Sequence, residues 1–104
     1  MAADLSDSKF NSTSLKGAYL ADANLSAVQF IDIDVSGTDF SNALFTEQTT
    51  FEKAYAVQTN EPIGLPPQYS VELMSASDYS LKTGQRPFKI TVPEKIRPYK
   101  TELR

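Results

Sequence analysis

The sequence predicts an all-β solenoid followed by an extended, proline-containing arm. Large apolar residues recur at every fifth position through the first half of the chain, and all six prolines lie in the second half. A period of five fits neither the 3.6-residue period of a helix nor the two-residue period of a strand. A coil built from five-residue sides does fit it, if each side sends two side chains inward and three outward.

The main apolar series steps by five from Leu5 and slips by one residue near its end. A second series of small or β-branched residues lies two positions before it, from Ala3 to Ala43. The slip falls within TEQTTF, where the apolar residue is Phe51 instead of position 50, and the pattern ends near Ala56. The predicted inward core is Leu5, Phe10, Leu15, Leu20, Leu25, Phe30, Val35, Phe40, Phe45 and Phe51.

Units such as ADLSD, AYLAD, ANLSA and TDFSN give residues 2–56 the form A(D/N)LXX, which resembles the pentapeptide-repeat family. The resemblance implies a right-handed, four-sided β-helix with four pentapeptides to a coil, hence about two and a half coils in this chain. Residues twenty apart would then stack. Gly17 and Gly37 are twenty apart and are expected at one corner, where a residue without Cβ tolerates unusual backbone angles.

The predicted division is a pentapeptide-repeat β-helix over residues 1–56 and an extended arm over 57–104. A short helix is expected near residues 70–79, but QYSVEL also alternates like a strand and leaves helix or strand open for residues 69–80. PFKITVP predicts an edge strand over residues 88–92, because apolar and polar residues alternate between two prolines. The ends of so short a solenoid need a cover, supplied by the carboxy-terminal half or by a partner.

Composition argues against most enzyme chemistry. With no cysteine and no histidine, the chain lacks thiol chemistry and the commonest acid-base group and metal ligand, so we expect no enzyme activity, cofactor or metal. DIDVSG, from Asp32, resembles the start of a calcium loop, but its twelfth position is Ala43 instead of glutamate. No apolar run approaches the ~20 residues that cross a bilayer, and no secretory signal is seen, so a cytoplasmic or stromal location is expected.

Charge divides along the chain. Residues 1–61 carry nine acidic side chains against three lysines, whereas residues 82–104 carry seven basic against two acidic side chains. A rigid acidic rod with a basic arm favours a structural or linker subunit that binds and stabilises a larger protein assembly. The arm residues expected to bind this partner are aromatic, basic or on one strand face: Tyr69, Phe88, Ile90, Val92, Arg97, Tyr99 and Arg104. Tyr19, Ile31 and Leu44 are expected to point outward from the rod as further contact points.

Two other functions stay open. Some pentapeptide-repeat proteins mimic DNA with a long acidic rod and inhibit DNA gyrase as dimers; the acidic half of this chain is similar in charge but shorter than that mimicry needs. The basic tail is instead compatible with nucleic acid or an anionic membrane surface, an interpretation that its acidic residues and unclustered aromatics disfavour. The family is abundant in cyanobacteria and plastids, which by association favours a photosynthetic host complex, an antenna or a photosystem.

Overall fold

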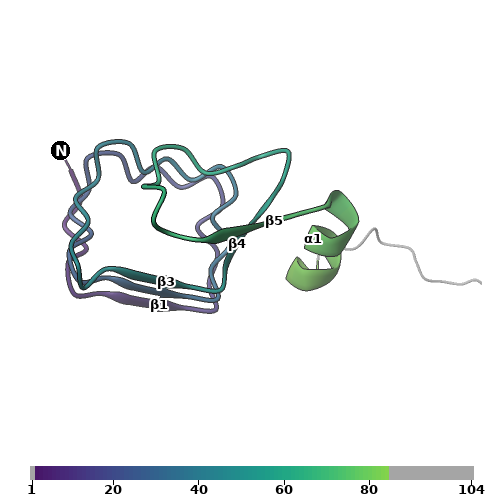
Figure 1. The fold of residues 1–104 in the computed structure, drawn as a ribbon, viewed down its shortest axis with the longest axis horizontal. Coiled ribbons are helices and arrows are strands. Elements are labelled where there is room, and N and C mark those ends of the chain that lie inside the picture. The colour runs from purple at the N-terminus through teal and green to yellow at the C-terminus, as the bar shows by residue number, and fades with distance from the viewer. Residues whose placement is uncertain (1, 85–104) are drawn as a thin grey trace, which may run out of the picture.

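The computed structural model describes residues 2–84, which form a short solenoid with one helix on its side (Figure 1). The strands are short because each belongs to one side of a coil, and the chain turns a corner after it. The elements are β1 (Lys9–Asn11), β2 (Gln29–Ile31), β3 (Thr50–Glu52), β4 (Ala54–Val57), β5 (Val71–Met74) and α1 (Ala76–Thr83).

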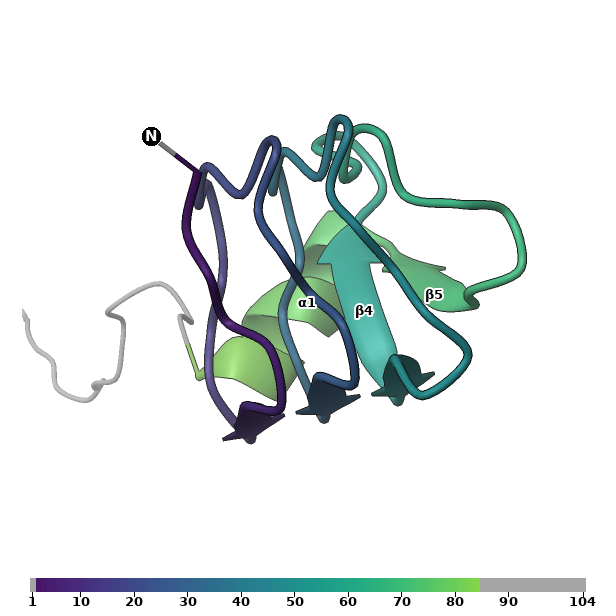
Figure 2. The ribbon, with the colours of Figure 1, turned by 90° about the vertical axis from the view of Figure 1, so that its left-hand side faces the viewer.

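Four ladders of parallel pairing connect successive coils, and each ladder forms one side of the solenoid (Figure 2). We call residues 3–22 the first coil, 23–42 the second coil and 43–63 the third coil. The first side pairs Asp4, Asn24 and Leu44; the second side is the sheet β1-β2-β3; the third side pairs Ser14, Asp34 and Tyr55 of β4; the fourth side pairs Tyr19, Asp39 and Ile63. Residues twenty apart therefore stack from the first coil to the second, as the sequence predicts.

A left-handed backbone conformation recurs at the corners. In the first two coils, every residue two positions after an inward apolar residue has a positive φ, between 54° and 70°. Gly17 and Gly37 occupy two of these corners, as predicted, and the other six are Asp7, Ser12, Asp22, Ala27, Asp32 and Asn42. Asp and Asn adopt this region more readily than other residues with a side chain, which fits their frequency at these corners.

Where an Asp or Asn precedes the inward residue, its side chain holds the turn. Asp4, Asn24, Asp34 and Asp39 each accept a hydrogen bond, through Oδ1, from the backbone N–H two residues further on, at 2.9 to 3.1 Å. These are Asx-type turns, in which a short polar side chain replaces a backbone acceptor. The polar residues of the repeat therefore stabilise the corner, while its apolar residues fill the interior.

The core lies on the solenoid axis and is best sealed in the second coil. Leu25, Phe30, Val35 and Phe40 have no exposed surface, whereas the corresponding residues of the first coil are half-buried. The Phe30 ring stacks between those of Phe10 and Phe51, with centroids 5.4 and 4.4 Å away. Full burial of such a side chain contributes about 1.5–3 kcal/mol before entropy is counted, so the apolar column is the main stabilising feature of the rod.

The predicted register slip is confirmed. Phe30 pairs with Phe51, twenty-one residues later, and the additional residue is accommodated in the turn over residues 46–49. Thr49 is buried there, and its Oγ1 donates to the carbonyl of Leu25 at 2.7 Å while accepting the N–H of Thr46 at 3.1 Å. The insertion therefore leaves no unpaired hydroxyl at the core.

The solenoid continues past residue 56, where the predicted boundary stood. Ile63 pairs with Asp39, and the N–H of Phe40 donates to the Ile63 carbonyl at 2.7 Å. The chain then crosses the end of the third coil (Figure 1), and the Tyr69 ring packs on Phe45 and Phe51 with centroids 5.4 and 4.7 Å away. Residues 64–70, which we call the end cap, cover this end of the core. Only a contact between distant segments identifies them as part of the fold, because they carry no repeat.

The predicted extended arm over residues 57–104 is corrected for residues 57–84, the part that the structure describes. Residues 71–74 form β5, which pairs in parallel with β4, and residues 76–83 form α1, so the open choice over 69–80 resolves as a strand followed by a helix. Ser75 caps α1 by accepting the N–H of Asp78, and Gly84 ends it with a φ of 75°. The predicted edge strand over residues 88–92 lies outside the described residues.

Glycine substitution tests the end cap. We expect Gly64→Ala to lower the free energy of unfolding by about 3 kcal/mol and Gly17→Ala by about 1 kcal/mol. Both glycines have positive φ, but a Cβ at Gly64 would lie 2.7 Å from the backbone nitrogen of Ser41, whereas a Cβ at Gly17 has no neighbour within 4 Å. Urea unfolding followed by circular dichroism measures both; equal losses would mean that residue 64 does not pack against the second coil.

The Asx turns predict a pH dependence. Hydrogen bonds from Ser41, by its hydroxyl and its N–H, hold the pKa of Asp39 below its ordinary value of 3.8. A depressed pKa in the folded state stabilises the fold above the unfolded pKa, and this contribution is lost as the pH falls through the folded pKa. Asp39→Asn keeps the Oδ1 acceptor, as Asn24 does naturally, and removes the titration. We therefore expect its acid-unfolding midpoint to lie at lower pH than that of the unchanged chain; a midpoint at higher pH would contradict the assignment.

Candidate protein-interaction surfaces

The described residues hold neither a cluster of metal ligands nor a membrane-spanning helix. Among residues 2–84, no group of three acidic side chains lies close enough to hold a metal ion. Within the same residues, no helix has the length and apolar character to cross a membrane. Candidate sites must therefore be sought on the outer sides of the solenoid.

Helix α1 covers the third side, and Tyr79 is its anchor. Tyr79 is the buried residue of this helix, and its hydroxyl donates to Oδ2 of Asp34 at 2.5 Å. The carboxyl of Asp34 is itself buried, and its other oxygen accepts the N–H of Ser36. The two aspartates of the calcium-loop resemblance are thus already paired, because Asp32 contacts Lys82 of α1 with 3.5 Å between Oδ1 and Nζ.

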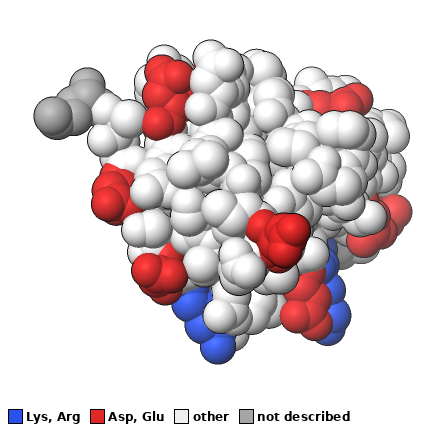
Figure 3. Space-filling model, turned by 60° about the vertical axis from the view of Figure 1, so that its left-hand side comes forward, with Lys and Arg blue, Asp and Glu red and all other residues white. Residues whose placement is uncertain are grey.

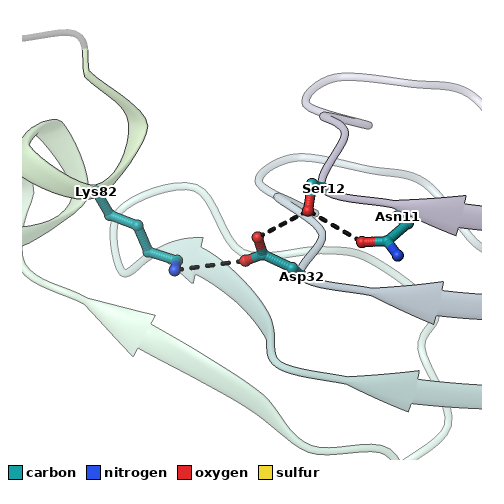
Figure 4. A network of polar contacts seen from close by, with 4 residues as sticks. All are labelled: Asn11, Ser12, Asp32 and Lys82. Atoms are coloured by element: carbon teal, nitrogen blue, oxygen red, sulfur yellow. Dashed lines mark hydrogen bonds and ion pairs between the residues drawn. The ribbon is translucent and has the colours of Figure 1, made fainter.

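Figure 4 shows the polar contacts at the end of α1. Ser12 Oγ bonds to Asp32 Oδ2 at 3.2 Å and to Asn11 Oδ1 at 3.0 Å, so the Lys82 ion pair is joined to the corners of the first two coils. The Lys82 ammonium also lies 4.7 Å from the Tyr55 ring centroid. Burial, and then the nearby charges of Asp34 and Asp32, raise the pKa of Tyr55 above its ordinary value. This surface attaches the helix to the rod and is occupied by it.

The fourth side presents two large apolar side chains to solvent in one ladder, whereas Leu44, Leu73 and Leu81 are exposed elsewhere on the described surface. Tyr19 is 76% exposed and Ile63 is 58% exposed, one on each side of Asp39 in a single ladder. The backbone holds these side chains in place: the N–H of Asp39 donates to the Ala18 carbonyl, and the N–H of Ile63 donates to the Thr38 carbonyl. Two exposed apolar residues at fixed positions on a flat side are typical of a contact surface.

Of the three residues expected to point outward, two are exposed and one is half-buried. Tyr19 and Leu44 point outward and are exposed, with Leu44 on the first side, but Ile31 is half-buried. Ile63 could not be predicted from the repeat, because the step from Tyr55 to Ile63 is eight residues, three more than the period of five. The prolines around it indicated the extended arm instead.

The predicted partner-binding residues mostly lie beyond the structure. Tyr69 is described, and it packs in the end cap, where burial raises the pKa of its hydroxyl. The other six, Phe88, Ile90, Val92, Arg97, Tyr99 and Arg104, lie outside the described residues. Tyr69 is therefore placed to stabilise the fold, and a role in partner binding would require its half-buried ring to contact the partner at the rim of the cap.

The acidic charge is spread over the rod. Residues 2–84 carry eleven acidic side chains against four lysines, a net charge of −7. In Figure 3 the acidic groups on the visible face are separated by uncharged surface instead of forming a continuous stripe. Two of the eleven, Asp32 and Asp34, contact α1.

The Tyr79 anchor can be tested directly. Tyr79→Phe is expected to lower the free energy of unfolding by about 2 kcal/mol, because it leaves the buried Asp34 oxygen without its donor. Tyr19→Phe is the matched control: this tyrosine is exposed, and its loss of a hydroxyl should change stability by less than about 0.5 kcal/mol. Thermal and urea unfolding give both values, and an equal effect in the two variants would rule out the anchor.

Comparison with known proteins identifies the repeat. The family model of pentapeptide repeats matches residues 3–42 with eight copies. This confirms the family that the sequence resembles, over the two coils in which the five-residue register is unbroken. No curated protein and no solved structure matches the chain.

Proposed function

Since residues 3–42 are pentapeptide repeats, we propose that this protein is a non-catalytic structural subunit that binds and stabilises a larger protein assembly. It would bind through the fourth side of the rod and through its basic carboxy-terminal arm. The observation that carries the proposal is the exposed pair Tyr19 and Ile63, in register on one rigid side. Tyrosine is one of the residue types that concentrate binding energy at protein interfaces, and Ile63 would add apolar contact area beside it.

The rigidity of the side supports the proposal. Parallel backbone bonds hold Tyr19, Asp39 and Ile63 at adjacent levels of the solenoid, so their backbone positions are set before binding. Preorganisation lowers the entropy cost of association, and a small contact area can therefore bind usefully. The Asp39 carboxylate between the apolar residues would favour a partner that places a donor or a cation there.

The arm supplies the second half of the proposed contact. Residues 85–104 carry six basic against two acidic side chains, opposite in sign to the rod. Arg97, Tyr99 and Arg104 are the residue types that contribute most at interfaces. We propose a photosynthetic complex as the first class of partner assembly to test, because the family is abundant in cyanobacteria and plastids.

The alternative of DNA mimicry has the net charge of −7 in its favour. A mimic of DNA needs charge at regular spacing along one face, because phosphates repeat along the duplex. The acidic groups of the rod are separated by uncharged surface on the face shown in Figure 3, and Asp32 and Asp34 are engaged by α1. The interaction with a protein assembly is therefore the better-supported function.

A pull-down from native extract tests the proposal. The full chain is compared with the double variant Tyr19→Asp and Ile63→Asp, with Leu44→Asp as the matched exposed control on the first side, and with a chain that ends at Gly84. We expect the double variant to recover at least about ten-fold less of the protein assembly, since removal of two interface anchors costs more than 1.4 kcal/mol. Leu44→Asp should bind normally, and the shortened chain should bind more weakly than the full chain.

The same experiment distinguishes the alternatives. Equal recovery by the double variant and the unchanged chain would exclude the fourth side as the contact surface. Recovery of gyrase by every chain, including the one that ends at Gly84, would replace this proposal with DNA mimicry. Circular dichroism of each variant shows whether the fold is kept, which is expected because both side chains are exposed.

A further inference from the structure

The first coil has an unpaired backbone edge. In the second coil, the N–H groups of Asn24, Asp34 and Asp39 donate to carbonyls of the first coil. Among residues 2–84, the corresponding N–H groups of the first coil, those of Asp4, Ser14 and Tyr19, donate to nothing, and β1 is an edge strand of its sheet. Such an edge is a template for another strand.

The apolar interior is also open at this end. Leu5, Phe10, Leu15 and Leu20 are half-buried, whereas the residues stacked on them, Leu25, Phe30, Val35 and Phe40, have no exposed surface. The opposite end is covered by the end cap, with Tyr69 over Phe45 and Phe51. Phe45 and Phe51 are themselves half-buried, so the end cap covers that end in part, whereas no segment among residues 2–84 crosses the first coil.

Helix α1 carries the chain back to the open end. It begins next to β5, at the capped end, and runs past the coils toward the first coil (Figure 2). Lys16 of the first coil lies 5.6 Å from the Tyr79 ring centroid, and Thr83 lines a hollow together with Ser12, Thr13 and Ser14. Gly84 thus follows α1 at the corner where β1 ends.

We propose that residues 88–92 of the same chain pair with β1 as an antiparallel strand and cover the open end. Three residues, 85–87, span up to about 10 Å, more than the spacing of about 4.8 Å between neighbouring strands. A strand that starts at the end of β1 and runs back along it is antiparallel. Phe88, Ile90 and Val92 share one face and would lie over the half-buried apolar residues, and Pro87 and Pro93 bound the strand at positions that proline tolerates.

Charge disfavours one of the alternative registers. With Ile90 opposite Phe10, Lys89 lies opposite Asn11 and Thr91 opposite Lys9. Shifting the strand so that Phe88 faces Phe10 would put Lys89 opposite Lys9, and like charges directly opposite each other are destabilising. The backbone groups also fit. The N–H of Ser12 donates to the Ile31 carbonyl and the N–H of Gln29 donates to the Ser8 carbonyl, so Ser8 and Ser12 face the second coil. The N–H and carbonyl groups of Lys9 and Asn11 alternate with those of Ser8 and Ser12 along the chain and point to the free edge.

This inference is independent of the proposed function and reassigns part of the arm. Phe88, Ile90 and Val92, expected from the sequence to bind a partner, would instead cap the chain's own rod. Arg97, Tyr99 and Arg104 would follow the strand and remain for the partner. Because the proposed pairing of residues 88–92 with β1 needs no partner, it is tested on the purified full chain alone.

Disulfide trapping tests the pairing, since the chain has no other cysteine. The variant Asn11→Cys with Lys89→Cys places two thiols on directly opposed residues, whose Cα separation of about 5.5 Å suits a disulfide. The matched control is Glu52→Cys with Lys89→Cys, because Glu52 holds the corresponding position on the far strand of the sheet. We expect an intrachain disulfide, seen as a faster monomer on a non-reducing gel, at a yield at least about ten-fold above the control.

A charge on the inward face completes the test. Ile90→Asp should lower the trapping yield by about ten-fold, because it places a carboxylate over Phe10. Thr91→Asp makes the same charge change on the outward face, opposite Lys9, and should not lower the yield. In hydrogen exchange, the amides of Lys9 and Asn11 should exchange at least about ten-fold more slowly in the unchanged chain than in Ile90→Asp. Equal yields in the paired variant and its control, or unchanged exchange, would overturn the proposal. Disulfide-linked dimers in place of monomers would show that a second copy supplies the strand.

Discussion

The structure depends on one backbone constraint: in the first two coils, every fifth residue has a positive φ, and the chain turns a corner there. At six of the eight corners in the first two coils, the corner N–H donates to a backbone carbonyl one coil later; examples are Asp7 to Ser26 and Gly37 to Asn60. At Ala27 it donates to the Thr46 hydroxyl instead. A positive φ costs roughly 1–2 kcal/mol in a residue with a side chain, so these bonds offset a real strain. Stacking of the coils supplies the hydrogen bonds that stabilise the corners, and the regular spacing of the corners in turn lets successive coils stack in register.

The apolar column follows from the corners. With one corner every five residues, each side sends the same two positions inward, and Phe10, Phe30 and Phe51 stack in a single line. The inserted residue before Thr49 shows how tightly this is held, because the turn absorbs it locally and returns Phe51 to the column. Interior positions of the solenoid are therefore committed to packing, and function is left to the outer sides and the ends.

The sides and ends of the rod are not equivalent. The third side is covered by α1, one end is partly covered by the end cap, and the fourth side presents Tyr19 and Ile63 to solvent. Helix α1 is held by one buried tyrosine, one ion pair and contacts of two lysines with aromatic rings, a small attachment for a helix of eight residues. Because α1 runs toward the first coil, Gly84, the last residue before the basic segment, lies beside the first coil of the acidic rod.

The amino-acid sequence by itself determined the inward residues, the twenty-residue stacking, the shared corner of Gly17 and Gly37 and the slip before Phe51. Each of these depends on a local period that is repeated many times, so the signal accumulates along the chain. Only the tertiary structure decided the roles of Ile63, Tyr69 and Tyr79, because each occurs once in a segment without a period. Tyr69 was predicted to bind a partner because aromatic residues of the arm concentrate interface energy; its position on Phe45 and Phe51 could not be predicted. No local rule relates these residues, since the apolar surface that Tyr69 covers exists only after the coils have stacked.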